Sequence, residues 1–123
     1  MTDIPHDKLE QLEQIQAGLQ AGETIVAVYD CIGAGTGFVG ITSKRVILQD
    51  KSFAGKKVAI TSVPYTQIRS VSMVSDKSML GKHFSSSSIA IDAGGTIHEA
   101  EFRGEAKAKH IHDVILWAVL PKT

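Results

Sequence analysis

The glycines at positions 35, 37 and 40 come closest to a known chemical motif in this sequence. The segment Gly35-Thr36-Gly37-Phe38-Val39-Gly40 has the spacing G-x-G-x-x-G, which can hold the pyrophosphate of a dinucleotide at the N-terminus of a helix. Residues 41–48, which follow it, are rich in β-branched side chains and predict a strand instead. We therefore interpret the glycines as a hairpin turn that needs a positive φ, and we predict no cofactor.

The histidines do not form a pattern of metal ligands. His110 and His112 are two residues apart in a predicted helix, so their side chains point to nearly opposite faces. His6, His83 and His98 have no His, Cys or carboxylate side chain at ligand spacing. We predict no metal site, and we interpret His98 as a partly buried histidine.

The nucleophiles and carboxylates lack the partners that catalysis requires. Cys31 is the single cysteine, so it cannot form an internal disulfide, and no basic neighbour lowers its pKa. The serines at 85–88 have no nucleophile elbow around them. Glu99 and Glu101 share one face of a predicted strand with Arg103, which is typical of a solvated face. We therefore predict that the protein is not an enzyme.

Basic residues are concentrated in the middle of the chain, although its net charge is zero. Residues 40–83 hold eight Lys or Arg and two acids, a local excess of six positive charges. This excess indicates either an anion-binding surface for phosphate, acidic lipid or an acidic protein segment, or a solvated face. Aromatic residues are only 6%, and no helix is placed to read bases, so nucleic acid is not an expected partner. The candidate anion-binding residues are Lys44, Arg45, Lys51, Lys56 and Lys57.

The elements that would position these residues begin with a helix over residues 1–20. Asp3 suits an N-cap and Pro5 a first helical turn. Apolar residues then recur at spacings of three, three and four, and glycines mark the end of the helix. A stripe this narrow must dock either on the protein's own sheet or on a neighbouring subunit. Its members are Leu9, Leu12, Ile15 and Leu19.

Seven short segments rich in β-branched or alternating residues predict strands. They span residues 23–32, 38–42, 45–50, 57–61, 68–75, 84–92 and 96–103. In the fourth segment Val58 and Ile60 are predicted to face inward, and in the sixth Ile89 and Ile91 are. The glycines at 94 and 95 predict a tight hairpin between the last two strands.

A second helix is predicted from Gly104 to about Leu120. One stripe at positions i, i+3, i+4 and i+7 faces the core, and its members are Ile111, Val114, Ile115 and Ala118. The last turns add Trp117 and other apolar residues, so that end is apolar nearly all round and needs a second cover.

Together these elements predict a mainly β (α+β) fold. We expect an antiparallel β-barrel of about seven strands, capped by the C-terminal helix, at residues 21–121, with an extra amphipathic helix at residues 1–20. The longest apolar run, residues 114–120, is too short to span a bilayer. The acidic N-terminus does not have the pattern of a signal peptide, and the single cysteine is consistent with a reducing compartment. We therefore expect a cytoplasmic location.

Three sequence segments in this order resemble the bacterial pleckstrin-homology (PH-like) domain family. They are Gly22-Glu23 before the first strand, Ile41-Thr42-Ser43-Lys44-Arg45-Val46-Ile47-Leu48, and Val63-Pro64-Tyr65-Thr66-Gln67-Ile68-Arg69-Ser70-Val71. The resemblance covers about residues 20–120 and implies a PH-like barrel with a C-terminal helix. It also implies symmetric ring-forming homo-oligomers, as in several members. Eukaryotic relatives bind phosphoinositides through basic residues near the first loop, but residues 33–37 contain no Lys or Arg, which argues against this ligand.

The sequence therefore favours a non-enzymatic binding or assembly module that associates with itself through its helices and sheet edges. A protein or peptide partner is a further possibility on the same surfaces. The candidate interface residues are Leu9, Leu12, Ile15, Trp117 and Leu120. The alternative hypothesis is a peripheral domain that binds phosphate or an anionic membrane surface through the basic hairpin.

Overall fold

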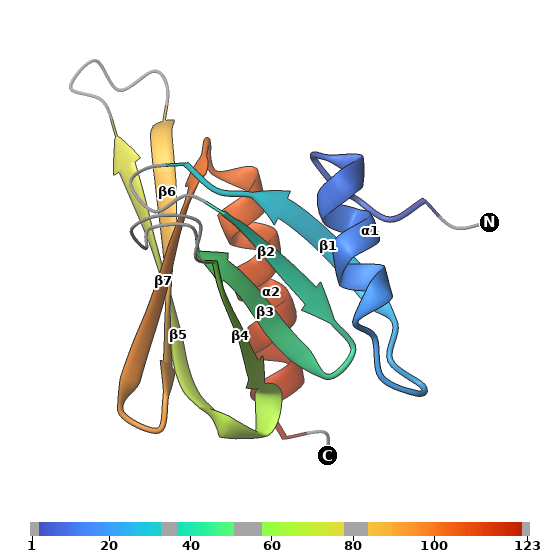
Figure 1. Cartoon of the computed structure of the whole chain (residues 1–123). Coiled ribbons are helices and arrows are strands. Elements are labelled where there is room, and N and C mark those ends of the chain that lie inside the picture. The colour runs from blue at the N-terminus through green and yellow to red at the C-terminus, as the bar shows by residue number, and fades with distance from the viewer. Residues whose placement is uncertain (1–2, 33–36, 51–57, 78–83, 122–123) are drawn as a thin grey trace. The chain divides into compact units, whose positions relative to one another are not determined.

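A computed structural model describes residues 3–32, 37–50, 58–77 and 84–121. The chain forms two compact units, Met1–Pro64 and Tyr65–Thr123. Their elements are labelled in Figure 1.

The first unit contains one helix and a four-stranded antiparallel sheet. Helix α1 (Leu9–Ala17) precedes β1 (Ile25–Asp30), β2 (Phe38–Thr42), β3 (Arg45–Asp50) and β4 (Ala59–Pro64), and the strands lie in the order β1-β2-β3-β4. The strand register sets Val28 opposite Gly40, Gly40 opposite Ile47, and Ile47 opposite Ser62. Because side chains alternate between faces, this row of residues crosses one face of the sheet.

Helix α1 packs on that face, beside β1 and β2 (Figure 1). Leu12 and Ile15 are buried in a cluster with apolar side chains of the sheet, namely Val28, Phe38 and Ile47. A Cβ atom at Gly40 would lie 2.8 Å from Cδ1 of Ile15, so the absence of a side chain there lets the helix come close. The apolar stripe therefore docks on the sheet of its own unit, the first of the two alternatives that the sequence left open.

The chain before α1 is extended, so the predicted helix start at Asp3 and Pro5 is wrong. Lys8 occupies the N-cap position and makes no side-chain capping bond. Instead, the Val28 N–H donates to the Pro5 carbonyl at 3.0 Å, and the Asp7 N–H donates to the Val28 carbonyl at 3.2 Å. These bonds satisfy backbone groups on the outer edge of β1, which a helix starting earlier would leave unpaired.

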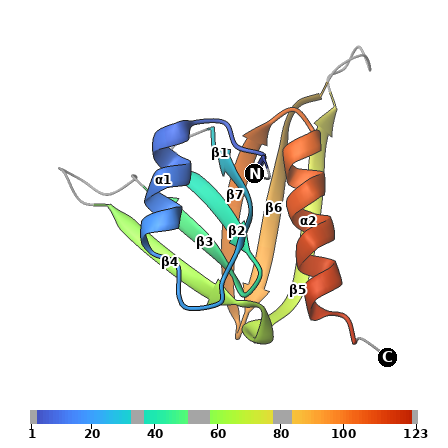
Figure 2. The same ribbon diagram turned by 90° about the vertical axis from the view of Figure 1, so that its right-hand side faces the viewer.

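The second unit contains a three-stranded sheet and a long helix. A short 3₁₀ turn (Tyr65–Gln67) leads into β5 (Ile68–Lys77), β6 (Phe84–Ala93), β7 (Thr96–Arg103) and α2 (Ala106–Val119). The strands are antiparallel in the order β5-β6-β7, and α2 runs alongside β5 and β6 (Figure 2).

Side-chain burial in the second unit follows the sequence pattern. Ile89 and Ile91 are each 1% exposed, which confirms their predicted inward orientation. On α2, Ile111 and Ile115 are fully buried. Gly94 and Gly95 both have positive φ and form the predicted tight turn between β6 and β7.

The described residues form seven antiparallel strands that lie between two helices in the chain, which confirms the predicted element order and the mainly β class. The sheet architecture differs from the prediction, because the described strands hydrogen-bond as two separate sheets and do not close into one barrel. Among the described residues, no helix is long and apolar enough to cross a membrane.

The fourth predicted strand is shifted and its orientation was predicted wrongly. It spans β4, and Val58 and Ile60 are 48% and 59% exposed rather than inward-facing. Ile60 is opposite Gln49, on the face that α1 covers over β1 and β2 but not out to β4. Val63 is the buried apolar residue of this strand.

The predicted glycine turn at residues 33–37 lies outside the described part of the chain except for Gly37. Gly37 is not among the described glycines with positive φ. A Cβ atom there would instead overlap the backbone carbonyl of Gln49 on β3. Gly37 is therefore required by the close approach of two strands, not by its own φ.

These contacts predict a graded series of Gly→Ala substitutions, measured by urea unfolding. Gly37→Ala meets rigid backbone and should destabilise the fold by about 3 kcal/mol or more. Gly40→Ala meets the flexible end of Ile15 and should cost about 1 kcal/mol. Gly18→Ala, whose Cβ would lie at an ordinary 3.8 Å from the Ile15 carbonyl, is the control and should change stability by less than about 0.5 kcal/mol. Equal effects at all three positions would contradict this explanation.

Candidate functional site

A buried ion pair lies at the start of the first sheet. Glu23 directly follows Gly22, whose φ of 78° turns the chain from α1 toward β1. The Glu23 side chain is 0% exposed. Arg45, the first residue of β3, donates from Nε to Oε2 of Glu23 at 2.8 Å and from Nη2 to Oε1 at 3.0 Å. This two-point contact matches the planar guanidinium to the carboxylate.

Thr42 connects this pair to the turn between β2 and β3. Its hydroxyl donates to Oε2 of Glu23 at 2.5 Å. Oγ1 of Thr42 also accepts the backbone N–H groups of Lys44 and Arg45, both at 3.1 Å. Thr42 therefore fixes the turn and orients the carboxylate at once.

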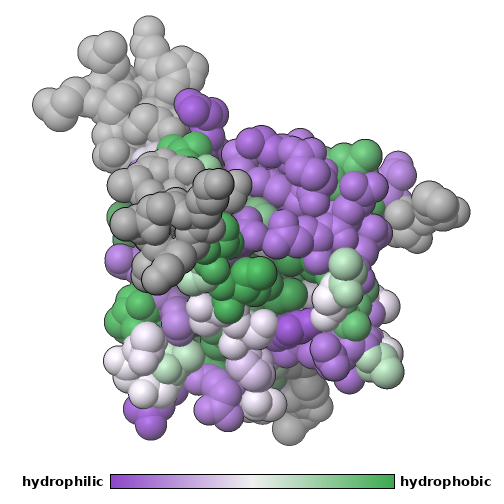
Figure 3. All heavy atoms as spheres, in the orientation of Figure 1, coloured by the Kyte–Doolittle hydropathy of each residue, from purple (hydrophilic) through white to green (hydrophobic). Residues whose placement is uncertain are grey.

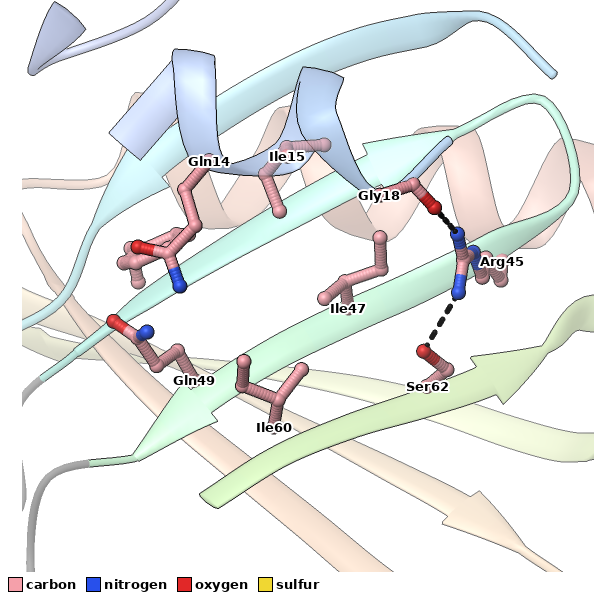
Figure 4. A pocket seen from close by; sticks show the side chains of 9 residues that line it. Gln14, Ile15, Gly18, Arg45, Ile47, Gln49, Ile60 and Ser62 are labelled. Atoms are coloured by element: carbon pink, nitrogen blue, oxygen red, sulfur yellow. Dashed lines mark hydrogen bonds between the residues drawn. The ribbon is translucent and has the colours of Figure 1, made fainter. Parts of the chain in front are cut away.

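The guanidinium of Arg45 also forms hydrogen bonds with the end of α1 and with β4. Nη2 of Arg45 donates to the Gly18 carbonyl at 2.9 Å, and Nη1 donates to Oγ of Ser62 at 2.9 Å (Figure 4). The carboxylate in turn accepts the backbone N–H of Gln20 at 2.9 Å. One ion pair thus joins the end of α1, the start of β1, and strands β3 and β4.

The charges of the pair stabilise each other. The hydrogen bond from Arg45 lowers the pKa of Glu23 to about 2, against the opposing effect of burial. Glu23 in turn raises the pKa of Arg45 above its ordinary value. Both groups are therefore ionised at neutral pH, and the positive charge of Arg45 is neutralised inside the unit.

A groove lies beside Arg45, between α1 and the strands β3 and β4 (Figure 4). Its volume is about 120 Å³, well below the roughly 300–1,000 Å³ of a typical small-molecule pocket. In the space-filling view, hydrophobic atoms are exposed over the strands beside the hydrophilic surface of α1 (Figure 3). The apolar lining residues are Ile15, Phe38, Ile47 and Ile60, and the others are Gln14, Gly18, Arg45, Gln49 and Ser62.

The groove has the chemistry of a contact surface. Among the described residues that line it, Arg45 is the one ionisable side chain, and its charge is already paired with Glu23. Gln14, Gln49 and Ser62 can donate or accept hydrogen bonds at the rim. A site of this size and polarity fits one or two apolar side chains of a partner.

The structure places the predicted anion-binding residues in different settings. Arg45 forms an ion pair with Glu23, so its charge is already neutralised and does not suit the predicted contact with an anion. Lys44 is exposed in the β2–β3 turn, and its contact with anions stays a prediction. Lys51, Lys56 and Lys57 lie outside the described residues.

The predicted interface residues also divide into two groups. Leu12 and Ile15 are only 8% and 4% exposed because they fill the core under α1, so they cannot form the predicted interface. Leu9, Trp117 and Leu120 are 57%, 69% and 51% exposed, and their role at an interface stays a prediction.

Sequence reasoning missed two parts of this site. Glu23 and Arg45 both belong to the family-like segments, and the opposite charges at the starts of the first and third predicted strands were the available signal for the pair. The groove was not predicted because Ile60 was expected to face the core. Among the described residues, no three His, Cys, Asp or Glu side chains are grouped to hold a metal ion.

Comparison with known families assigns most of the chain. The family model described as "Bacterial PH domain" matches residues 2–119. The match confirms the resemblance noted in the sequence and extends it to include α1. No curated protein matches the chain significantly.

The lowered pKa of Glu23 predicts an acid-sensitive fold. A carboxyl whose pKa falls from 4.5 when unfolded to about 2 when folded stabilises the fold fully above pH 4.5. This stabilisation, about 3 kcal/mol, should disappear as the pH falls from 4.5 through 2. Urea unfolding at a series of pH values measures it.

Glu23→Gln should be less stable than the parent at pH 7, and the difference should shrink at acid pH. Asp113→Asn is the matched control, because Lys109 lowers the pKa of Asp113 but that carboxylate is 53% exposed. Its removal should change stability little. If Glu23→Gln loses as much stability below pH 4.5 as the parent does, the loss does not come from protonation of Glu23.

Proposed function

Because the chain belongs to the bacterial PH domain family, we propose that it is a non-catalytic binding and assembly module that associates with copies of itself. PH-like domains are generally binding modules without catalytic activity. The observation that carries the proposal is an exposed apolar surface on the last turns of α2. Leu116, Trp117 and Leu120 form this surface, which we term the α2 patch.

The α2 patch lies opposite the buried side of the helix. Ala108, Ile111 and Ile115 are 0% exposed, whereas Leu116 and Trp117 are 38% and 69% exposed. Leu120, the C-cap residue of α2, follows Trp117 by three residues and Leu116 by four. Side chains at these two spacings are neighbours on a helix surface, so Leu120 joins the other two into one apolar surface. Exposed apolar groups gathered around a tryptophan are typical of protein contact sites.

Three features support association between identical copies. The chain has no net charge, so two copies do not repel each other over long range. The groove by Arg45 is too small for a typical small ligand but accepts apolar side chains. The paired charge of Arg45 also removes one of the five cations on which the anion-binding alternative depends.

The test is the native mass of the 13.2 kDa chain, measured by light scattering during size-exclusion chromatography over a range of concentrations. The parent should run as a multiple of the chain mass. Trp117→Lys should lower that mass, because it places a charge in the α2 patch. Val74→Lys is the control, because Val74 on β5 is similarly exposed, at 64%. A monomeric parent at every concentration would refute self-association, and equal effects of the two variants would exclude the α2 patch.

A further inference from the structure

Helix α1 lies over only two of the four strands of its sheet. An α-helix with its side chains is about 10 Å wide and neighbouring strands are about 4.8 Å apart, so one helix covers about two strands. α1 packs on β1 and β2, the first two strands in the order β1-β2-β3-β4. The face on which α1 lies therefore has the width for one more helix, beside α1 and over β3 and β4.

The part of this face over β3 and β4 is apolar and incompletely filled. Ile60 is 59% exposed and points into the groove, where Ile15 and Ile47 form the lining beside it (Figure 4). The groove holds about 120 Å³, close to the roughly 150 Å³ of an apolar cavity that binds benzene, so it can take one large apolar side chain. Every residue that lines it belongs to the first unit, so this unit forms the groove by itself.

The helix that borders the groove is acidic. Residues 1–22 contain four acids and one lysine. Glu10 precedes Gln14 by four residues, so its side chain is a neighbour of a residue that lines the groove. Glu10 and Glu13 are both exposed, and neither forms an ion pair with another described residue. Because the charge of Arg45 is neutralised inside the unit, it does not offset these carboxylates. The border therefore favours positive charge on a partner.

We propose that this surface binds a basic amphipathic helix of another protein, which lies beside α1 and over β3 and β4. One apolar side chain of the partner fills the groove, and a second, one turn away, packs on Ile60. Lys or Arg side chains along the partner's flank face Glu10 and Glu13. The amides of Gln14 and Gln49 bind polar groups at the rim. This contact is separate from the α2 patch and does not rest on self-association.

The chemistry of the surface favours this partner over other occupants. A second copy that presents its α2 patch would bring no Lys or Arg, because the last turn of α2 has none. An extended peptide adds to the edge of a sheet rather than to its face, since the backbone groups within a sheet are already paired. A drug-sized molecule needs a larger pocket than this groove.

The first experiment uses a synthetic peptide as the probe for the full chain. The peptide is a helix of about 15 residues with one stripe of leucines, lysines beside the stripe and alanines elsewhere. In NMR spectra of the isoleucine methyl groups, the signals of Ile15, Ile47 and Ile60 should shift as the peptide is added. Because few side chains take part, we expect a dissociation constant on the order of 100 µM. Ile97, 56% exposed on the second unit, should not respond.

The apolar contact is tested by removing one side chain at matched exposure. Ile60→Gln should weaken peptide binding by about ten-fold, because the apolar area of Ile60 no longer meets the partner. Ile97→Gln is the control and should leave binding unchanged. Both positions are exposed, and circular dichroism checks that both variants keep the fold.

The charge contact is tested with a pair of substitutions at the same cost in net charge. Glu10→Gln with Glu13→Gln should weaken binding by about three-fold at low salt, and the difference should vanish at about 1 M salt. Glu99→Gln with Glu101→Gln, on β7, is the control and should have no effect. A second peptide, with glutamates in place of the lysines, should bind the parent more weakly than the first does.

The outcomes separate this proposal from self-association. Shifts at the groove, lost with Ile60→Gln and weaker with the glutamate peptide, support it. No shift at about 1 mM peptide, or equal binding of the two peptides, overturns it. If the groove signals shift when the protein alone is concentrated, a second copy occupies the groove, which overturns this proposal and supports self-association. A monomeric parent that binds the lysine peptide refutes self-association alone.

Discussion

The buried pair of Glu23 and Arg45 is the interaction on which the first unit depends. Removing two charges from water costs several kcal/mol per ion, and only good geometry and further hydrogen bonds offset that cost. Here both carboxylate oxygens accept from Arg45, and the remaining lone pairs accept from Thr42 and the Gln20 backbone. The loss of the Arg45 charge would leave the fully buried Glu23 carboxylate without its ion-pair partner, which is far more costly than the loss of a surface ion pair.

The same pair determines which part of the sheet α1 covers. The Gly18 carbonyl at the end of α1 is bound to Arg45, and the chain returns to β1 directly after Glu23. With its C-terminal end fixed in this way, the nine-residue helix lies on β1 and β2 and does not reach β4. Because Gly40 has no side chain, Ile15 packs closely against β2 at that position. The groove, and the exposure of Ile60, follow from this placement of the helix.

The sequence predicts those features that depend on neighbours along the chain. The strands at 38–42, 45–50 and 96–103 were predicted with their observed bounds, because β-branched runs end at turn residues. Contacts between distant segments had no such signal. The pairing of residues 5–7 with β1 overrode the helix start at Asp3, and the partner of Arg45 lies 22 residues away. Alternation gives the two faces of a strand but does not show which strands pair, so one barrel was expected where two sheets form.

The protection of the sheet edges bears on how identical copies of the chain could assemble. The segment at residues 5–7 covers the outer edge of β1, and Glu99 and Glu101 place charges on β7. Covering segments and charges oppose pairing with another strand, so these two edges are poor places for a second copy to add. A contact between two different surfaces is head-to-tail, and it closes into a ring when the rotation between neighbouring copies allows it, whereas a surface that meets itself gives a two-fold dimer. The exposed apolar residues of the α2 patch lie on a helix, so a contact there would need no sheet edge.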